Sequence, residues 1–276
     1  MSPPDWLGVC RRAVDSQRRI FAEVRGIPER TQYVGRGEGG DNTLVIDRRA
    51  EDAIFSELEG LAEGGSSFIA ISEERGEVAF GADADGARVI IDPIDGSLNA
   101  RRMIPSYSVS IAVASGPSMA DVELGYVYDF GADEEFVARR GEGATVNGEQ
   151  IRAESPYDGR EVVGLEAAKP EWVLPATEAL LGKVFRFRGI GSIAINLAYV
   201  AAARMDGMIS LRPCRSVDAA AGQLIVREAG GRVAFPGLEL AQAGLGLEER
   251  YTLVAACTDD GLATLHEASR KVEASK

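Results

Sequence analysis

The chain has 276 residues, of which 45% are hydrophobic, and it carries a formal net charge of −13 at pH 7. This length and hydrophobic content suit one large domain, or two closely packed halves, with a substantial core. The negative charge argues against nucleic acid and anionic membranes as partners, because its long-range field repels polyanions. The three cysteines are widely spaced and no signal peptide or membrane span is evident, which predicts a cytoplasmic protein.

The predicted elements change character along the chain. Apolar residues follow a helical spacing between Asp5 and Val24 and again between Ala50 and Leu61, which predicts two amphipathic helices. Short apolar runs then extend from "SFIAIS" to "EEFVARR" and lead to the turn signal Asn147-Gly148, a pattern typical of a mostly antiparallel sheet. From about Glu161 strand-like and helix-like segments alternate, which predicts a layered α/β arrangement.

The one plausible boundary lies at residues 156–160. It divides the chain into an N-terminal α+β half, residues 1–157, and a C-terminal α/β half, residues 158–276. No flexible linker separates them, so we expect the halves to pack closely. A cleft between two such halves is a favoured place for a ligand.

The stretch "VIIDPIDGSLN" places two carboxylates, Asp92 and Asp95, directly after a strand-like run. Pro93 suits a chain that leaves a sheet, Gly96 permits a tight backbone path, and Ser97 is a good N-cap for a short helix. Carboxylates at this place would repel the anion that a helix N-terminus binds, unless a divalent cation bridges the carboxylates to a phosphate. The alternative is an Asx-type turn that only caps a helix.

Two further stretches place carboxylates at the ends of predicted elements. In "IAISEERGE", Glu73 and Glu74 follow a strand-like run, and in "SVDAAAGQLIVREAGG", Asp218 begins a helix rich in small residues. Each has a simpler explanation, a solvated turn for the glutamates and an N-cap for Asp218.

Together these stretches resemble the inositol monophosphatase superfamily of Mg²⁺-dependent sugar phosphatases. "DPIDGSLN" is similar to its DPxDGTxN signature, and "VDAAAGQLIVREAGG" is similar to WDxAAGxxxxxEAGG, with Val217 in the Trp position. The resemblance runs from the first helix to the last and implies a layered αβαβα sandwich, a homodimer, and two or three Mg²⁺ ions for which Mn²⁺ can substitute.

The resemblance also implies roles for individual residues. The metal ligands would be Glu73, Asp92, the carbonyl of Ile94, Asp95 and Asp218. Glu73 would also serve catalysis, while Asp41 and Ser97 would orient or deprotonate the attacking water. The residues expected to bind substrate are Asp95, Gly96, Ser97, Arg188, Ser192 and Arg212.

The C-terminal half resembles the archaeal branch of the superfamily, whose members often hydrolyse both inositol phosphates and fructose 1,6-bisphosphate. Arg188 and Arg212 stand where that branch places arginines that contact the substrate. The planar, permanently charged guanidinium suits a second phosphate. The alternatives are a 3′(2′),5′-bisphosphate nucleotidase with the same metal signatures and a noncatalytic phosphosugar-binding protein. Sensitivity to lithium is a further expectation from the resemblance.

Overall fold

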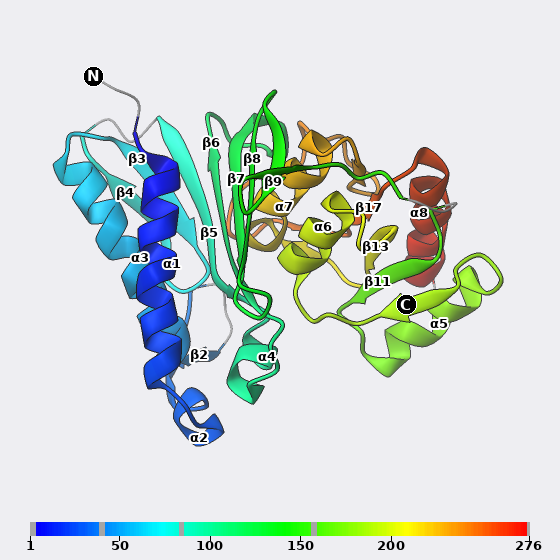
Figure 1. The fold of residues 1–276 in the computed structure, drawn as a ribbon, viewed down its shortest axis with the longest axis horizontal. Coiled ribbons are helices and arrows are strands. Elements are labelled where there is room, and N and C mark those ends of the chain that lie inside the picture. Colours follow the sequence, from blue (N-terminus) through cyan, green and yellow to red (C-terminus); the bar gives the residue numbers. More distant parts are fainter. Residues whose placement is uncertain (1–3, 39–41, 83–85, 156–158, 275–276) are drawn as a thin grey trace.

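The computed structural model describes residues 4–38, 42–82, 86–155 and 159–274, which form five alternating layers of helices and sheets (Figure 1). In order across the molecule these are a helix pair, an eight-stranded sheet, a second helix pair, a five-stranded sheet and a third helix pair. Three hydrophobic clusters fill the spaces between the layers. The predicted layered αβαβα sandwich is therefore confirmed.

The first layer consists of α1 (Trp6–Glu23) and α3 (Val45–Glu63), the two amphipathic helices expected from the sequence. The carboxylate of Asp5 caps α1 by accepting a hydrogen bond from Gly8 N at 3.0 Å. Buried Ile54, Phe55 and Phe68 join this layer to the sheet. Between α1 and α3 lie the short α2 (Ile27–Arg30) and the strand pair β1 (Tyr33–Arg36) and β2 (Asn42–Leu44).

The eight-stranded sheet is antiparallel except where β3 pairs in parallel with β5. The turn signal Asn147-Gly148 forms the two-residue connection of a hairpin, with φ of 50° and 82° at its two residues. In spatial order the strands are β10 (Glu149–Ile151), β9 (Gly143–Val146), β8 (Glu134–Arg139), β7 (Val122–Asp129), β6 (Ser108–Ala114), β5 (Ala87–Asp95), β3 (Phe68–Ser72) and β4 (Gly76–Phe80).

The central layer consists of α6 (Ile193–Ala201) and α7 (Ser216–Glu228). Two glycines permit its close packing. A Cβ on Gly222 would lie 2.5 Å from Leu197 of α6, and one on Gly125 of β7 would lie 2.6 Å from the carbonyl oxygen of Ala221. Thus α7, although it belongs to the C-terminal part of the chain, packs on the eight-stranded sheet, and the two sheets share one helical layer.

The five-stranded sheet is mixed, with parallel pairs at β12–β11–β13 and antiparallel pairs at β13–β17–β15. The last helix pair, α5 (Pro170–Leu180) and α8 (Asp259–Ala274), covers its outer face. The strands are β11 (Val162–Glu166), β12 (Arg186–Arg188), β13 (Gly207–Ser210), β15 (Arg232–Ala234) and β17 (Val254–Ala256); a separate pair is β14 (Cys214–Arg215) with β16 (Arg250–Tyr251). No helix in the described ranges is both long and apolar enough to cross a bilayer.

Candidate active site and metal centre

A bulge at the end of β5 brings Asp92 and Asp95 to the same cavity. Asp92 pairs with Ser110 of β6 and Asp95 with Ser108, so β5 takes three steps where β6 takes two. In a regular strand, residues three apart point to opposite faces, and one extra residue restores the same face. The strand was expected to end at Asp92; instead it continues to Asp95, because the bulge absorbs Pro93 without ending the ladder.

The turn after β5 leads directly into α4 (Ser97–Arg102). Gly96 has a left-handed φ of 93°, and a Cβ there would lie 3.0 Å from the carbonyl oxygen of Gly191, so glycine is required. Ser97 was expected to cap this helix, but it is the first helical residue, and its hydroxyl donates to the carbonyl oxygen of Ile94 at 2.8 Å. A predicted water-positioning hydroxyl thus touches a predicted metal-binding carbonyl.

Asp95 joins the two parts of the chain. Its Oδ2 accepts hydrogen bonds from the Ser192 hydroxyl and from Ala194 N, both at 2.6 Å, at the N-terminus of α6. The Ser192 oxygen also accepts from Ile195 N and so caps the helix. These donors and the positive end of the helix dipole stabilise the Asp95 carboxylate. Ser192 therefore lies beside Asp95, and its expected role in binding substrate stays a prediction.

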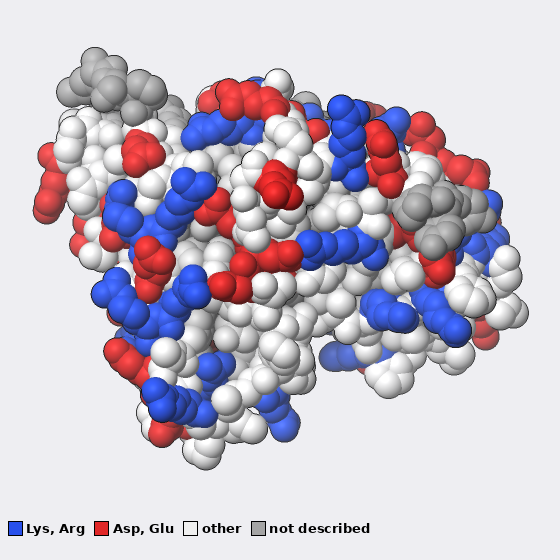
Figure 2. All heavy atoms as spheres, in the orientation of Figure 1, with Lys and Arg blue, Asp and Glu red and all other residues white. Residues whose placement is uncertain are grey.

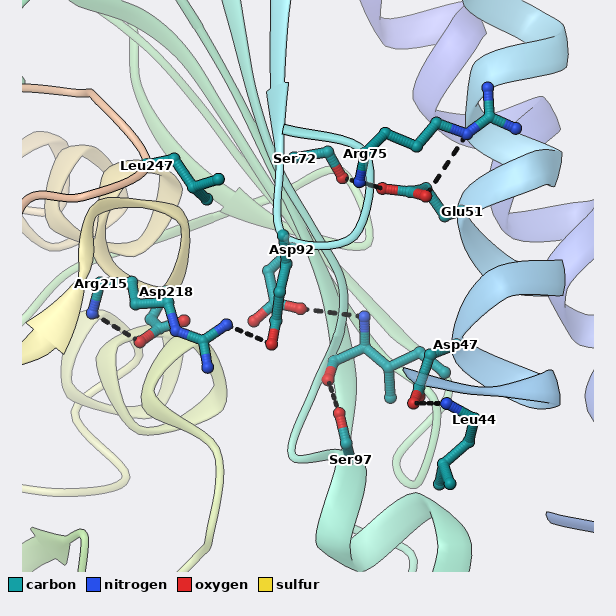
Figure 3. A network of polar contacts seen from close by, with 12 residues as sticks. Leu44, Asp47, Glu51, Ser72, Arg75, Asp92, Ser97, Arg215, Asp218 and Leu247 are labelled. Carbon is teal, nitrogen blue, oxygen red and sulfur yellow. Dashed lines mark hydrogen bonds and ion pairs between the residues drawn. The ribbon is translucent and has the colours of Figure 1, made fainter. Parts of the chain in front are cut away.

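A buried carboxylate that the sequence analysis did not single out holds the turn bearing Glu73 (Figure 3). Glu51 of α3 accepts from the Ser72 hydroxyl and from Arg75 N, and its second oxygen lies 3.4 Å from Arg75 Nε. Glu73 and Glu74 lie between these anchoring residues. The network fixes the end of β3 so that both glutamates line the same cavity as Asp92.

Asp218 and Asp47 occupy equivalent positions in two different helices. Each is the third residue of its helix and accepts a backbone hydrogen bond from the residue before the helix, Arg215 N at 2.9 Å for Asp218 and Leu44 N at 3.1 Å for Asp47 (Figure 3). This satisfies one free donor of each helix. Asp218, expected as an N-cap in the simplest case, is instead held at N3 and borders the cavity.

These elements enclose an acidic cavity of about 420 Å³. Its lining comes from β5, α4, the turn after β3 and the starts of α3 and α7, and comprises Leu44, Asp47, Glu73, Glu74, Asp92, Ile94, Asp95, Gly96, Ser97, Leu98, Arg101, Arg215 and Asp218. Within this cavity the carboxylates repel one another.

Burial first, and then this repulsion, raises the pKa values of the carboxylates. Burial and the neighbouring charges of Glu73 and Asp95 hold the pKa of Asp92 well above its usual range. Burial raises the pKa of Asp95 to about 6, against its hydrogen bonds at α6, and burial with repulsion from Asp95 raises that of Asp218 to about 6. Burial raises the pKa of Asp47 to about 7. A bound cation would relieve this energy.

The donor set fits a hard divalent cation, because carboxylate and carbonyl oxygens are the ligands that Mg²⁺ prefers. Among the described residues, no three acidic, histidine or cysteine side chains form a cluster that could hold one ion. A cationic side chain stands among the carboxylates. Arg215 forms an ion pair with Glu73, and its guanidinium lies between Asp218 and Asp92 in Figure 3.

A second cavity, of about 810 Å³, adjoins the acidic one and shares Leu98, Arg215 and Asp218 with it. Figure 2 shows the surface hollowed between the part that carries α4 and the part that carries α5, and both helices contribute to this lining. The cavity is basic, being lined by Lys169, Arg212 and Arg250 as well as Arg215.

One aromatic side chain, Trp172, organises two of these cations. The Arg212 guanidinium lies 4.6 Å and the Lys169 ammonium 4.8 Å from its ring centroid. Arg188 is placed differently. Its side chain is exposed on β12, donates to the Phe187 carbonyl at 2.8 Å, and is not among the described residues that line either cavity.

The structure therefore brings together most of the residues predicted from the sequence. Asp41 lies outside the described residues, and Arg188 lies apart from the two cavities. The carboxylates, Ile94, Gly96 and Ser97 line the acidic cavity, and Arg212 lines the basic one. Ser192 lines neither cavity and donates a hydrogen bond to Asp95. The sequence analysis did not single out Asp47, Glu51, Lys169, Trp172 and Arg215.

Comparison with known proteins agrees with this arrangement. The family model described as the inositol monophosphatase family matches residues 9–273. A fructose-1,6-bisphosphatase/inositol-1-monophosphatase of Thermococcus kodakarensis is 33% identical over 96% of this chain and 98% of its own length. Nus factor SuhB of Escherichia coli K12 is 34% identical over 82% of this chain and 84% of its own.

A solved structure of a Pyrococcus horikoshii protein, described as similar to inositol-1 monophosphatase, superimposes with a TM-score of 0.79 and 25% identity. The match covers 95% of this chain and 97% of that one.

Proposed function

The chain belongs to the inositol monophosphatase family, and from that membership and the chemistry of its acidic cavity we propose that it is a Mg²⁺-dependent phosphatase acting on inositol 1-phosphate, fructose 1,6-bisphosphate or both. The observation that carries the proposal is the bulge in β5, which directs Asp92 and Asp95 into one cavity with Glu73 and Asp218. A structural Asx turn needs neither the bulge nor the two distant carboxylates.

We assign the metal ligands to Glu73, Asp92, the carbonyl of Ile94, Asp95 and Asp218. When bound there, Mg²⁺, or Mn²⁺ in its place, would neutralise the phosphate, lower the pKa of the attacking water and stabilise the leaving alkoxide, so that no protein nucleophile is needed. Two or three ions are proposed, as the resemblance implies. Asp95 would use Oδ1, because Oδ2 is occupied by the donors of α6.

The water is oriented, in this proposal, by Ser97 and Asp47. Both line the acidic cavity. Within the described part of the chain the buried Oδ1 of Asp47 has no hydrogen-bond partner, while Oδ2 is anchored to Leu44 N. A carboxylate with one fixed and one available oxygen can accept a proton from a neighbouring hydroxyl or water. We therefore propose Asp47 for the role that the sequence analysis gave to Asp41, which lies outside the described residues.

The basic cavity would receive the rest of the substrate. A monophosphate needs only polar contacts there, whereas a second phosphate needs countercharge in a chain of net charge −13. Lys169 and Arg212 supply it, and because both already lie over the Trp172 ring, a second phosphate suits this cavity better than a stacked nucleobase. This favours a sugar bisphosphate over the bisphosphate nucleotide of the alternative hypothesis.

The test is phosphate release by the purified protein with Mg²⁺, measured on inositol 1-phosphate, fructose 1,6-bisphosphate and adenosine 3′,5′-bisphosphate. We expect turnover of one or both of the first two substrates and little of the third. Preferential turnover of the nucleotide would establish the nucleotidase alternative. Binding of the sugar phosphates without any release would establish the noncatalytic one. Light scattering of the same sample tests the expected homodimer.

A further inference from the structure

Arg215 stands at the junction of the two cavities and lines both. It is the residue before α7, three positions from Asp218, and its side chain is only 18% exposed. Its guanidinium pairs with Glu73, whose side chain is 16% exposed. A permanently charged group thus neutralises part of the carboxylate set.

A permanent positive charge in this place has a consequence for metal binding. The guanidinium cannot lose its proton at any accessible pH. It can leave Glu73 only by moving. The ion pair takes up the Oε1 oxygen of Glu73, and a metal ion at the other oxygen would still meet the positive charge of the guanidinium.

We propose that Arg215 is a built-in counter-cation, which occupies Glu73 in the metal-free protein and is released toward the substrate cavity when metal binds. The inference rests on the proposed function, since it takes Glu73 as a metal ligand. It makes Arg215 a positioning residue that couples the two cavities: metal loading frees a cation for an anionic substrate, and a bound anion helps to draw that cation away from Glu73.

The local backbone permits this movement without refolding. Arg215 N is fixed to Asp218 Oδ2, and Arg215 is paired with Arg250 in the β14–β16 ladder, so the main chain is held at both sides. The side chain alone has to turn. Because Arg215 lines both cavities, the movement that we propose is a change of side-chain rotamer.

The structure offers a matched control in Arg250. It lies directly across the β14–β16 ladder from Arg215 and also lines the basic cavity. Its guanidinium donates to the carbonyl oxygens of Leu247 and Glu249, at 2.6 and 2.9 Å. Removing Arg250 therefore removes the same charge from the same region without removing the partner of Glu73.

The experiment is calorimetric titration of Mn²⁺ into metal-free full-length protein, for the wild type, Arg215→Met, Arg215→Lys and Arg250→Met. A neighbouring opposite charge shifts the proton affinity of a carboxylate by about 10- to 1000-fold. We expect Arg215→Met to bind Mn²⁺ at least about tenfold more tightly than the wild type. Arg215→Lys, which keeps the charge, and Arg250→Met should stay within about threefold.

A second titration, of inorganic phosphate with and without saturating Mn²⁺, tests the coupling. Mn²⁺ should tighten phosphate binding several-fold more in the wild type than in Arg215→Met, because only the wild type releases a guanidinium. If Arg215→Met does not fold in chelator, judged by circular dichroism, Arg215→Gln takes its place.

Unchanged or weaker Mn²⁺ binding in the charge-free variants, with normal binding by the wild type, would overturn the inference and leave the proposed function intact. The inference would also be overturned if Arg250→Met tightened Mn²⁺ binding as much as Arg215→Met does. The loss of a positive charge anywhere in this region would then explain both results. If neither the wild type nor any variant binds Mn²⁺, the metal site is refuted and the inference fails with it.

Discussion

Glu166 is a buried carboxylate outside the proposed metal ligands, and its ionisation makes a measurable prediction. It ends β11, is 4% exposed, and accepts hydrogen bonds from Ile190 N and Gly191 N at 3.0 Å and from the Asn196 side chain. Burial raises its pKa to about 8, although the hydrogen bond from Gly191 opposes the shift. The residue fixes the loop that leads to Ser192 and so to Asp95.

The sign of the effect follows from the direction of the shift. The ordinary pKa of 4.5 describes the unfolded chain, so between about pH 4.5 and pH 8 the folded protein holds one more proton at this site. The free energy of unfolding then falls by up to about 1.4 kcal/mol for each unit by which the pH rises. From pH 5.5 to pH 7.5 the loss attributable to Glu166 is about 2–3 kcal/mol.

Glu166→Gln keeps the shape of the side chain and removes the ionisation, so the variant should not show this loss. The assay is urea denaturation of chelator-treated wild type and variant at pH 5.5, 6.5 and 7.5. Raised carboxylates that do not interact with Glu166, such as Asp47, affect both proteins equally and cancel in the difference, whereas the charge of Asp95 acts on Glu166 and is part of the measured effect. Glu228→Gln is the matched control, because Glu228 also accepts two backbone hydrogen bonds, from Gly141 and Gly143, but is only partly buried. The reasoning is refuted if the free energies of unfolding of the wild type and of Glu166→Gln differ by the same amount at all three pH values.

Three further predictions concern catalysis. Asp47→Asn and Ser97→Ala should each lower kcat by about 10²-fold or more with little change in KM, because orienting the water matters most in the transition state; an effect on KM alone would make them substrate ligands. Arg212→Ala should lower kcat/KM about tenfold more for fructose 1,6-bisphosphate than for inositol 1-phosphate. Arg188→Ala, which lies outside the cavity, should change the ratio of the two kcat/KM values less. Equal losses on both substrates would show that Arg212 does not bind the distal phosphate. Lithium at high concentration should inhibit turnover, and a titration without loss of rate would separate this chain from the lithium-sensitive members of the family.

The sequence predicted those members of the acidic cluster that stand close to one another in the chain. Asp92, Asp95 and Ser97 stand within six consecutive residues, and the signature around them names them directly. What the sequence did not show was how Asp92 and Asp95 come to share a face. The bulge depends on the pairing of β5 with β6, whose residues lie well beyond that signature.

The residues that were missed are those whose roles depend on tertiary contacts. Asp47 lies at N3 of a helix, as Asp218 does, but this helix was predicted only from Ala50 and in fact begins at Val45, so Asp47 lay outside the predicted element. Arg215 and Lys169 offered no local signal. A lone arginine or lysine in sequence is most often a surface residue, and only the fold shows that Arg215 reaches Glu73 and that Lys169 lies against Trp172.

The most direct test of the account is phosphate release from inositol 1-phosphate and fructose 1,6-bisphosphate by the chelator-treated protein, before and after addition of Mg²⁺, with Asp92→Asn and Asp218→Asn measured alongside. Each asparagine keeps the side-chain shape and removes a charge that would hold the cation. The account predicts that the wild type is inactive in chelator and recovers turnover with Mg²⁺, while both variants remain folded and inactive in either condition. Equal rates with chelator and with Mg²⁺, or full activity in the two variants, would contradict it.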